Sequence, residues 1–117
     1  MNTINNQIEK SLLREIDLLI EKAKNQGEKT VFELFKSALL KNYKDLFDKE
    51  RSEGTVHKET IDYAVEYCYT NICVLIRQFP NMSENEKEQM ISQGKVVKGI
   101  VKPIIERQLI KEGITIE

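Results

Sequence analysis

The chain has 117 residues, of which 40% are hydrophobic and 32% charged, with two prolines, no tryptophan and a formal net charge of −1. This length and composition predict one helical domain, residues 1–117, with a single core. The near-zero charge excludes a general attraction to nucleic acid or to a membrane surface, so binding to a polyanion would need a local basic patch.

The first part of the chain predicts two helices. Apolar residues recur at spacings of three and four between Ile4 and Ala23, which is typical of an amphipathic helix. Thr3 can cap its start, and Gly27 stands where such a helix would stop. A second helix start is indicated by Thr30-Val31-Phe32-Glu33, because this spacing of Thr and Glu matches the capping box.

The middle of the chain predicts the second helix and a third. The apolar face of the second helix covers residues 32–47, and a stop is expected over residues 51–54, where the glycine at position 54 ends the pattern. The third helix should begin near Val56 or Lys58. Pro80 closes it, because proline cannot continue a helix without breaking its hydrogen bonds.

The last part predicts a fourth helix. Ser83-Glu84-Asn85-Glu86 forms another capping box, after a possible joint at residues 79–83. Gly99 and Pro103 lie four residues apart and indicate a kink or a break. Residues 114–117 form a tail that is apolar over residues 114–116, and no strand pattern is present. The short connections predict an all-α, antiparallel bundle of four main helices with a kinked or broken final helix.

The cysteines and the chain ends bear on the compartment. Cys68 and Cys73 lie five residues apart, and on one helix they would point in different directions, which disfavours a disulfide. Neither a signal-peptide core nor a run of roughly 18 apolar residues occurs. We therefore expect a cytoplasmic protein with reduced thiols and no membrane partner.

The sequence contains no recognisable reaction centre. His57 is the only histidine, and neither cysteine has zinc-finger spacing, so we expect no metal site and no cofactor. Phosphate-binding glycine loops and nucleophile elbows are absent too. Glu59, Asp62 and Glu66 share a face of the third helix and could serve acid–base chemistry, but a solvated face is the simpler interpretation. We expect no enzyme.

Tyrosines cluster on the third helix. Tyr63 and Tyr67 are four residues apart and lie on one side of that helix. Aromatic rings can form stacking platforms for bases. Because no basic residues interleave with them, half-buried boundary tyrosines are the favoured interpretation.

Charge is unevenly distributed along the chain. Residues 44–66 carry four basic and seven acidic side chains, whereas residues 92–117 carry five basic and three acidic ones. Lysines three and four residues apart form one ridge on the fourth helix, where they could meet RNA phosphates or only keep a surface helix polar. The candidate RNA or partner contacts are Lys95, Lys98, Lys102 and Arg107.

The segment Gly94-Lys95-Val96-Val97-Lys98-Gly99-Ile100-Val101-Lys102-Pro103 follows a proline-ended helix and an acidic helix start. It resembles the Gly-Lys-Val-Met-x-x-x-Met-Pro string of the GatB/YqeY family, and SLLREIDLLIEKAKNQGEKTVFELFKSALLKN is similar to that family's opening helices. Ile104-Ile105-Glu106-Arg107 stands where the family carries a Lys-Gly run. The resemblance implies a non-catalytic helical module whose tail contacts tRNA, with Lys95, Lys98 and Lys102 in the tRNA-facing role.

Two classes of function therefore remain open. One is a small adaptor or regulator of the kind that mobile elements carry, which acts on a protein partner or by self-association through a helix face or the apolar tail. The other is a GatB/YqeY-like accessory module that contacts tRNA, or an RNA-bound enzyme, through the C-terminal basic helix. No feature indicates DNA binding. The first class is preferred.

Overall fold

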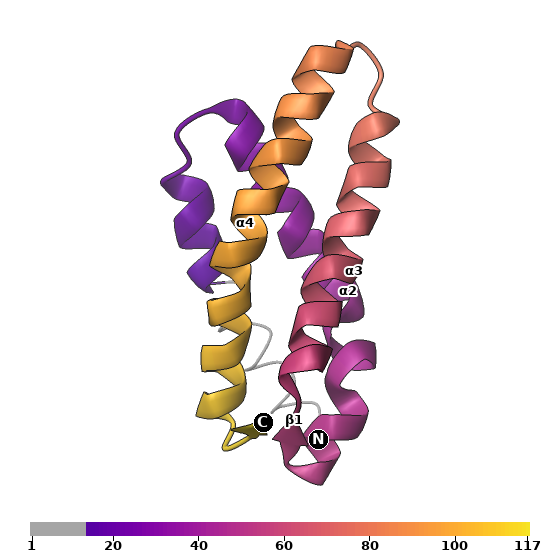
Figure 1. Cartoon of the computed structure of the whole chain (residues 1–117). Coiled ribbons are helices and arrows are strands. Elements are labelled where there is room, and N and C mark those ends of the chain that lie inside the picture. Colours follow the sequence, from indigo (N-terminus) through magenta and orange to yellow (C-terminus); the bar gives the residue numbers. More distant parts are fainter. Residues whose placement is uncertain (1–13) are drawn as a thin grey trace.

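The computed structural model describes residues 14–117 as an all-α bundle (Figure 1). Residues 14–21 are helical and are called the N-terminal segment below. Three long helices follow, α2 (Gln26–Glu53), α3 (Lys58–Arg77) and α4 (Glu84–Lys111), together with two short strands, β1 (Thr55–Val56) and β2 (Thr115–Ile116). Successive helices run antiparallel, as their short connections predict. The expected first-helix positions before residue 14 lie outside the described residues.

The start of α2 differs from the prediction. Its N-cap is Asn25, whose side-chain oxygen accepts a hydrogen bond from the backbone N–H of Glu28 at 2.9 Å. Thr30 therefore lies inside the helix and not at its cap. Gly27 is also helical and lies close to Gln93 of α4. The predicted stop at Gly27 and capping box at Thr30 were wrong, because an Asx cap five residues earlier starts the helix first.

The later helix ends agree with the sequence. Gly54 ends α2 in the left-handed region with φ of +84°, a conformation that costs glycine little. Ser83 caps α4 with both hydrogen bonds of the capping box in place. The helix α4 is continuous through Gly99 and Pro103, so of the two expected outcomes a break does not occur. Pro103 has no N–H to give to the carbonyl of Gly99, but the flanking turns keep the backbone helical.

The chain end corrects another expectation. After α4 the backbone turns at Gly113, with φ of +83°, and residues 114–117 come back to the bundle. β2 pairs in parallel with β1, with Thr55 beside Thr115 and Val56 beside Ile116. The prediction of no strands was therefore wrong. The tail is held by its own chain at the end of α2.

The core is built from all the described helices. Phe35 and Phe47 of α2, Ile61 and Ile72 of α3 and Ile105 of α4 are fully buried. Each such side chain contributes roughly 1.5–3 kcal/mol when it leaves water. These residues fix α3 between α2 and α4 and so determine which sides of α3 remain accessible.

Candidate functional site

The predicted lysine ridge lies along the border between α4 and α3. Lys98 pairs with Glu66 of α3, and its ammonium also lies 4.4 Å from the centroid of the Tyr69 ring. Lys102 Nζ lies 2.6 Å from Asp62 Oδ1. This hydrogen bond is the main cause of a raised pKa for Lys102. Two of the candidate cations thus face carboxylates of their own chain.

The other two candidates differ from this pair. Arg107 Nη2 lies 2.8 Å from Glu15 Oε1 of the N-terminal segment. Lys95 is exposed, and no salt bridge joins it to another residue in the described range. The structure therefore brings Lys98 and Lys102 together along the contact between α3 and α4, which is called the seam below. Lys95 stays open to solvent, and Arg107 lies against the N-terminal segment.

Gly94 explains how closely this seam is packed. A Cβ atom built at Gly94 would stand 2.7 Å from Cε1 of Tyr69, far inside van der Waals contact. The hydroxyl of Tyr69 donates a hydrogen bond to the backbone carbonyl of Ile91 at 3.0 Å. The seam between α3 and α4 is consequently a backbone-to-ring contact with salt bridges at its solvent edge.

The opposite side of α3 has no charge at all. Helical spacing places eight residues on the side that borders α2 and solvent. They include exposed apolar and aromatic side chains, and none is Asp, Glu, Lys, Arg or His. They are Thr60, Tyr63, Tyr67, Thr70, Asn71, Val74, Leu75 and Gln78.

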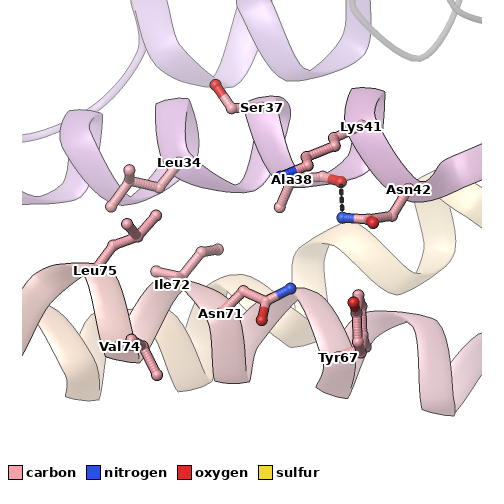
Figure 2. Close-up of a pocket in the computed structure, with 10 residues that line it drawn as sticks. All are labelled: Leu34, Ser37, Ala38, Lys41, Asn42, Tyr67, Asn71, Ile72, Val74 and Leu75. Atoms are coloured by element: carbon pink, nitrogen blue, oxygen red, sulfur yellow. Dashed lines mark hydrogen bonds between the residues drawn. The ribbon is translucent and has the colours of Figure 1, made fainter.

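A groove of about 420 Å³ runs between α2 and α3 along this uncharged side (Figure 2). Figure 2 shows Leu34 of α2 facing Leu75 of α3, and Ala38 facing Ile72. Its walls are mostly apolar, and among the described residues that line it Lys41 is the only charged one. The groove is thus an apolar channel with one cation at its rim.

Polar groups in the groove are largely satisfied or placed at its edge. The side-chain amide of Asn42 donates to the carbonyl of Ala38 at 2.8 Å (Figure 2), which turns it toward its own helix.

Two apolar side chains of the groove are open to solvent. Val74 is 50% exposed and Leu75 is 46% exposed. Apolar side chains this exposed on a charge-free face are typical of a contact surface.

The tyrosines differ in part from the expectation of half-buried positions. Tyr63 is 59% exposed and Tyr67 is 39% exposed, and their rings stack with centroids 6.0 Å apart. Tyr67 lines the groove, and Tyr63 extends the same face toward the start of α3. Together they offer a flat aromatic surface with little entropy to lose on binding.

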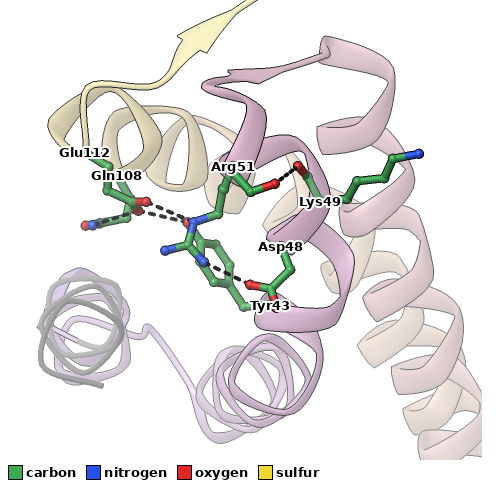
Figure 3. A network of polar contacts seen from close by, with 7 residues as sticks. Tyr43, Asp48, Lys49, Arg51, Gln108 and Glu112 are labelled. Carbon is green, nitrogen blue, oxygen red and sulfur yellow. Dashed lines mark hydrogen bonds and ion pairs between the residues drawn. The ribbon is translucent and has the colours of Figure 1, made fainter. Parts of the chain in front are cut away.

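A partly buried polar cluster joins the end of α2 to the end of α4 (Figure 3). Arg51 Nε lies 3.0 Å from Glu112 Oε1, and Glu112 also accepts from Tyr43 and Gln108. Burial and then the Glu112 charge raise the pKa of Tyr43 well above its usual range. This cluster holds the C-terminal turn of α4 against α2. The raised pKa keeps the Tyr43 phenol protonated, which is consistent with a structural role for the cluster.

The side chains that could take part in catalysis lie in environments that do not favour it. Burial raises the pKa of Cys68 to about 11, so its thiol stays protonated and unreactive near neutral pH. His57 lies beside Glu50 at 3.2 Å on the exposed corner between α2 and α3. Residues 14–117 contain no group of three or more potential metal ligands.

Neither the groove nor the seam was predicted from the sequence. The acidic face of α3 and the lysines of α4 are recognisable separately, but their pairing depends on how two antiparallel helices align. The signal that was available for the groove is the absence of Asp, Glu, Lys, Arg and His at the eight positions of α3 that share one side of the helix at helical spacing.

Comparison with protein-family models, curated protein sequences and solved structures returned no match. The GatB/YqeY resemblance therefore stays a prediction. Within the described range, no helix combines the length and apolarity that crossing a membrane requires.

Proposed function

We propose that this chain is a small non-catalytic helical interaction protein, an adaptor or regulator that binds a partner protein in the groove between α2 and α3. The observation that carries the proposal is the exposed, apolar and almost uncharged groove around Val74 and Leu75. The free thiols of Cys68 and Cys73 support a cytoplasmic setting for this binding.

The occupant that fits the groove is one amphipathic helix of the partner. Two antiparallel helices leave a channel into which the apolar ridge of a third helix can pack, with anchors at positions i, i+3, i+4 and i+7. Leu34 and Leu75 would receive aliphatic anchors, and Tyr67 would cover one flank. Because Lys41 is the cation among the described lining residues, the partner helix should carry a carboxylate beside its apolar ridge.

The alternative is a GatB/YqeY-like accessory module that contacts tRNA. Its support is Lys95, which is exposed and has no salt bridge within the described range. Lys98 and Lys102 would have to leave Glu66 and Asp62 to meet phosphates. Because this costs part of the gain from each phosphate contact, the groove is the better supported site.

Site-specific photo-crosslinking tests the proposal. A benzophenone amino acid replaces Tyr67 in the groove, and a matched variant carries it at Glu33, an exposed residue of α2. Expressed in source cells and irradiated, the Tyr67 variant should give one dominant protein adduct that the Glu33 variant lacks. Mass spectrometry of that adduct should locate the crosslink on an amphipathic helix with an acidic flank.

Two valine variants provide the control. Val74→Asp places a charge in the groove and should weaken binding of the identified partner at least about tenfold. Val96→Asp makes the same change on α4 and should leave that affinity within about twofold. Equal loss in both variants, or adducts that consist of RNA and vanish with Lys95→Glu, would overturn the groove as the binding site.

A further inference from the structure

We propose that the outward face of α4, formed by Ser92, Val96, Gly99 and Pro103, binds the same face of a second copy of this chain. The two α4 helices would lie antiparallel about a two-fold axis. This inference goes beyond the proposed function, because it uses a different helix face and does not require a partner in the groove.

The face is apolar and open. In Figure 1, α4 lies between the N-terminal segment and α3 and presents its length to the reader. Val96 is 67% exposed and Ile100 is 37% exposed. A hollow of about 430 Å³ beside Ile100 and Pro103 continues the face toward Leu18 of the N-terminal segment, with the charged Glu15, Lys22 and Arg107 also in its lining. Leu18 is itself 48% exposed.

Gly99 lies near the middle of this face. A Cβ atom built there would meet nothing within 4 Å, in contrast to Gly94, where it would meet Tyr69. Contacts inside the chain thus account for Gly94 but not for the absence of a side chain at Gly99. Glycine weakens a helix interior relative to alanine, and the property it offers in return is close approach of another backbone.

Charge complementarity identifies the occupant as a second copy. Lys95 and Glu106 lie eleven residues apart on one edge of the face, or three helical turns and roughly 16 Å. No salt bridge joins either of them to another residue of the described part, although Glu106 lies near enough to Lys102 to help raise the pKa of that lysine.

A two-fold axis turns this spacing into two reciprocal contacts between opposite charges. When two α4 helices lie antiparallel, Lys95 of one copy comes beside Glu106 of the other, and the same contact forms twice. The midpoint between the two residues falls at Ile100–Val101, between Gly99 and Pro103 of the face. In a parallel two-fold pair, the edge that carries Lys95 and Glu106 would instead lie against the opposite edge of the other copy, so the two residues would not meet. The apolar and charged contacts therefore coincide only in the antiparallel dimer.

Charge reversal tests this arrangement by sedimentation equilibrium of the full chain. Wild type should be dimeric at about 100 μM. Lys95→Glu and Glu106→Lys should each raise the dimer Kd roughly tenfold, because attraction becomes repulsion at both symmetric contacts. The double variant should return to within about threefold of wild type. A wild type that stays monomeric at this concentration, or a double variant weaker than either single one, would overturn the proposal.

Variants on the apolar part provide a second readout. Gly99→Leu fits the open space at that position in the monomer, so its far-UV circular dichroism should match wild type while the dimer is lost. Val74→Asp, in the α2–α3 groove, should leave the dimer Kd within about twofold. A Gly99→Leu chain that is folded and still fully dimeric would contradict the proposed face.

Discussion

On the side of α3 that faces α4, Asp62 and Glu66 pair with Lys102 and Lys98, and Tyr69 packs against the bare backbone of Gly94. On the side that borders α2, no position from Thr60 to Gln78 carries a charge, and Val74 and Leu75 are about half exposed. One helix therefore has a side whose contacts are completed within the chain and a side whose apolar groups are left open.

The comparison shows that a charged surface and an exposed apolar surface differ in how far the chain itself satisfies them. A ridge of lysines looks functional in the sequence, but at the seam most of its charge is balanced inside the molecule. The uncharged side looks unremarkable in the sequence, yet it is the one that leaves apolar surface in water. The proposed binding site therefore rests on exposed apolar surface and not on conspicuous charge.

The largest loss of stability at the seam is expected when Gly94 acquires a side chain. Gly94→Ala forces the Tyr69 ring or the α4 backbone to move, and we expect a loss of roughly 1–3 kcal/mol in the free energy of unfolding. Urea unfolding followed by circular dichroism measures it.

Gly99→Ala is the matched control in the same helix. Nothing stands within 4 Å of the added Cβ, so stability should rise by about 0.5–1 kcal/mol at concentrations where the chain is monomeric. Equal effects at the two glycines would show that the close contact with Tyr69 does not limit the seam.

The salt bridges at the seam should contribute far less than its packing. A double-mutant cycle with Lys98→Ala and Glu66→Ala should give a coupling free energy below about 1 kcal/mol that falls as salt is added. A coupling larger than the Gly94→Ala effect would mean that charge, and not packing, holds α3 against α4.

Glu50, at the corner between α2 and α3, should make a small, pH-dependent contribution to the stability of the fold. The backbone N–H of His57, followed by the hydroxyl of Thr60, stabilises the Glu50 carboxylate and lowers its pKa. A carboxyl with a lowered pKa in the folded state stabilises the fold above its ordinary range and stops doing so as the pH falls through the lowered value. Wild type should therefore melt higher than Glu50→Gln at about pH 6.

The same difference in melting temperature should shrink as the pH falls from about 6 through the lowered pKa of Glu50. Thermal melts of both chains across this range provide the measurement. If the difference stays constant with pH, the hydrogen bonds at Glu50 do not depend on its charge.

The parts of the fold that local chemistry determines were predictable. The cap at Ser83, the stop at Gly54 and the apolar faces of the helices depend on residues within one or two turns. The start of α2 was misplaced because Asn25 and Thr30 are both competent caps, and the cap at Asn25 starts the helix five residues before Thr30. The pairing of β1 with β2 was not predictable, because two strands of two residues, sixty positions apart, leave no periodic pattern.

The candidate site was predictable only in its parts. Asp62, Glu66, Lys98 and Lys102 were each recognisable as surface charges, but their pairing requires the alignment of α3 against α4. The groove could have been inferred from the missing charges on α3, although its partner wall on α2, with Leu34 and Ala38, depends on helix packing. Local patterns identified the elements, and their spatial arrangement determined which surfaces stay open.

The most direct test of the groove is to compare two variants against the partner that crosslinks at Tyr67. Val74→Asp should leave the free energy of unfolding within about 0.5 kcal/mol of wild type and weaken partner binding at least about tenfold. Lys98→Glu combined with Lys102→Glu should leave partner binding within about threefold at moderate salt. If the lysine variant loses the partner and Val74→Asp keeps it, the binding site lies on the basic edge of α4 and the account of the groove is wrong.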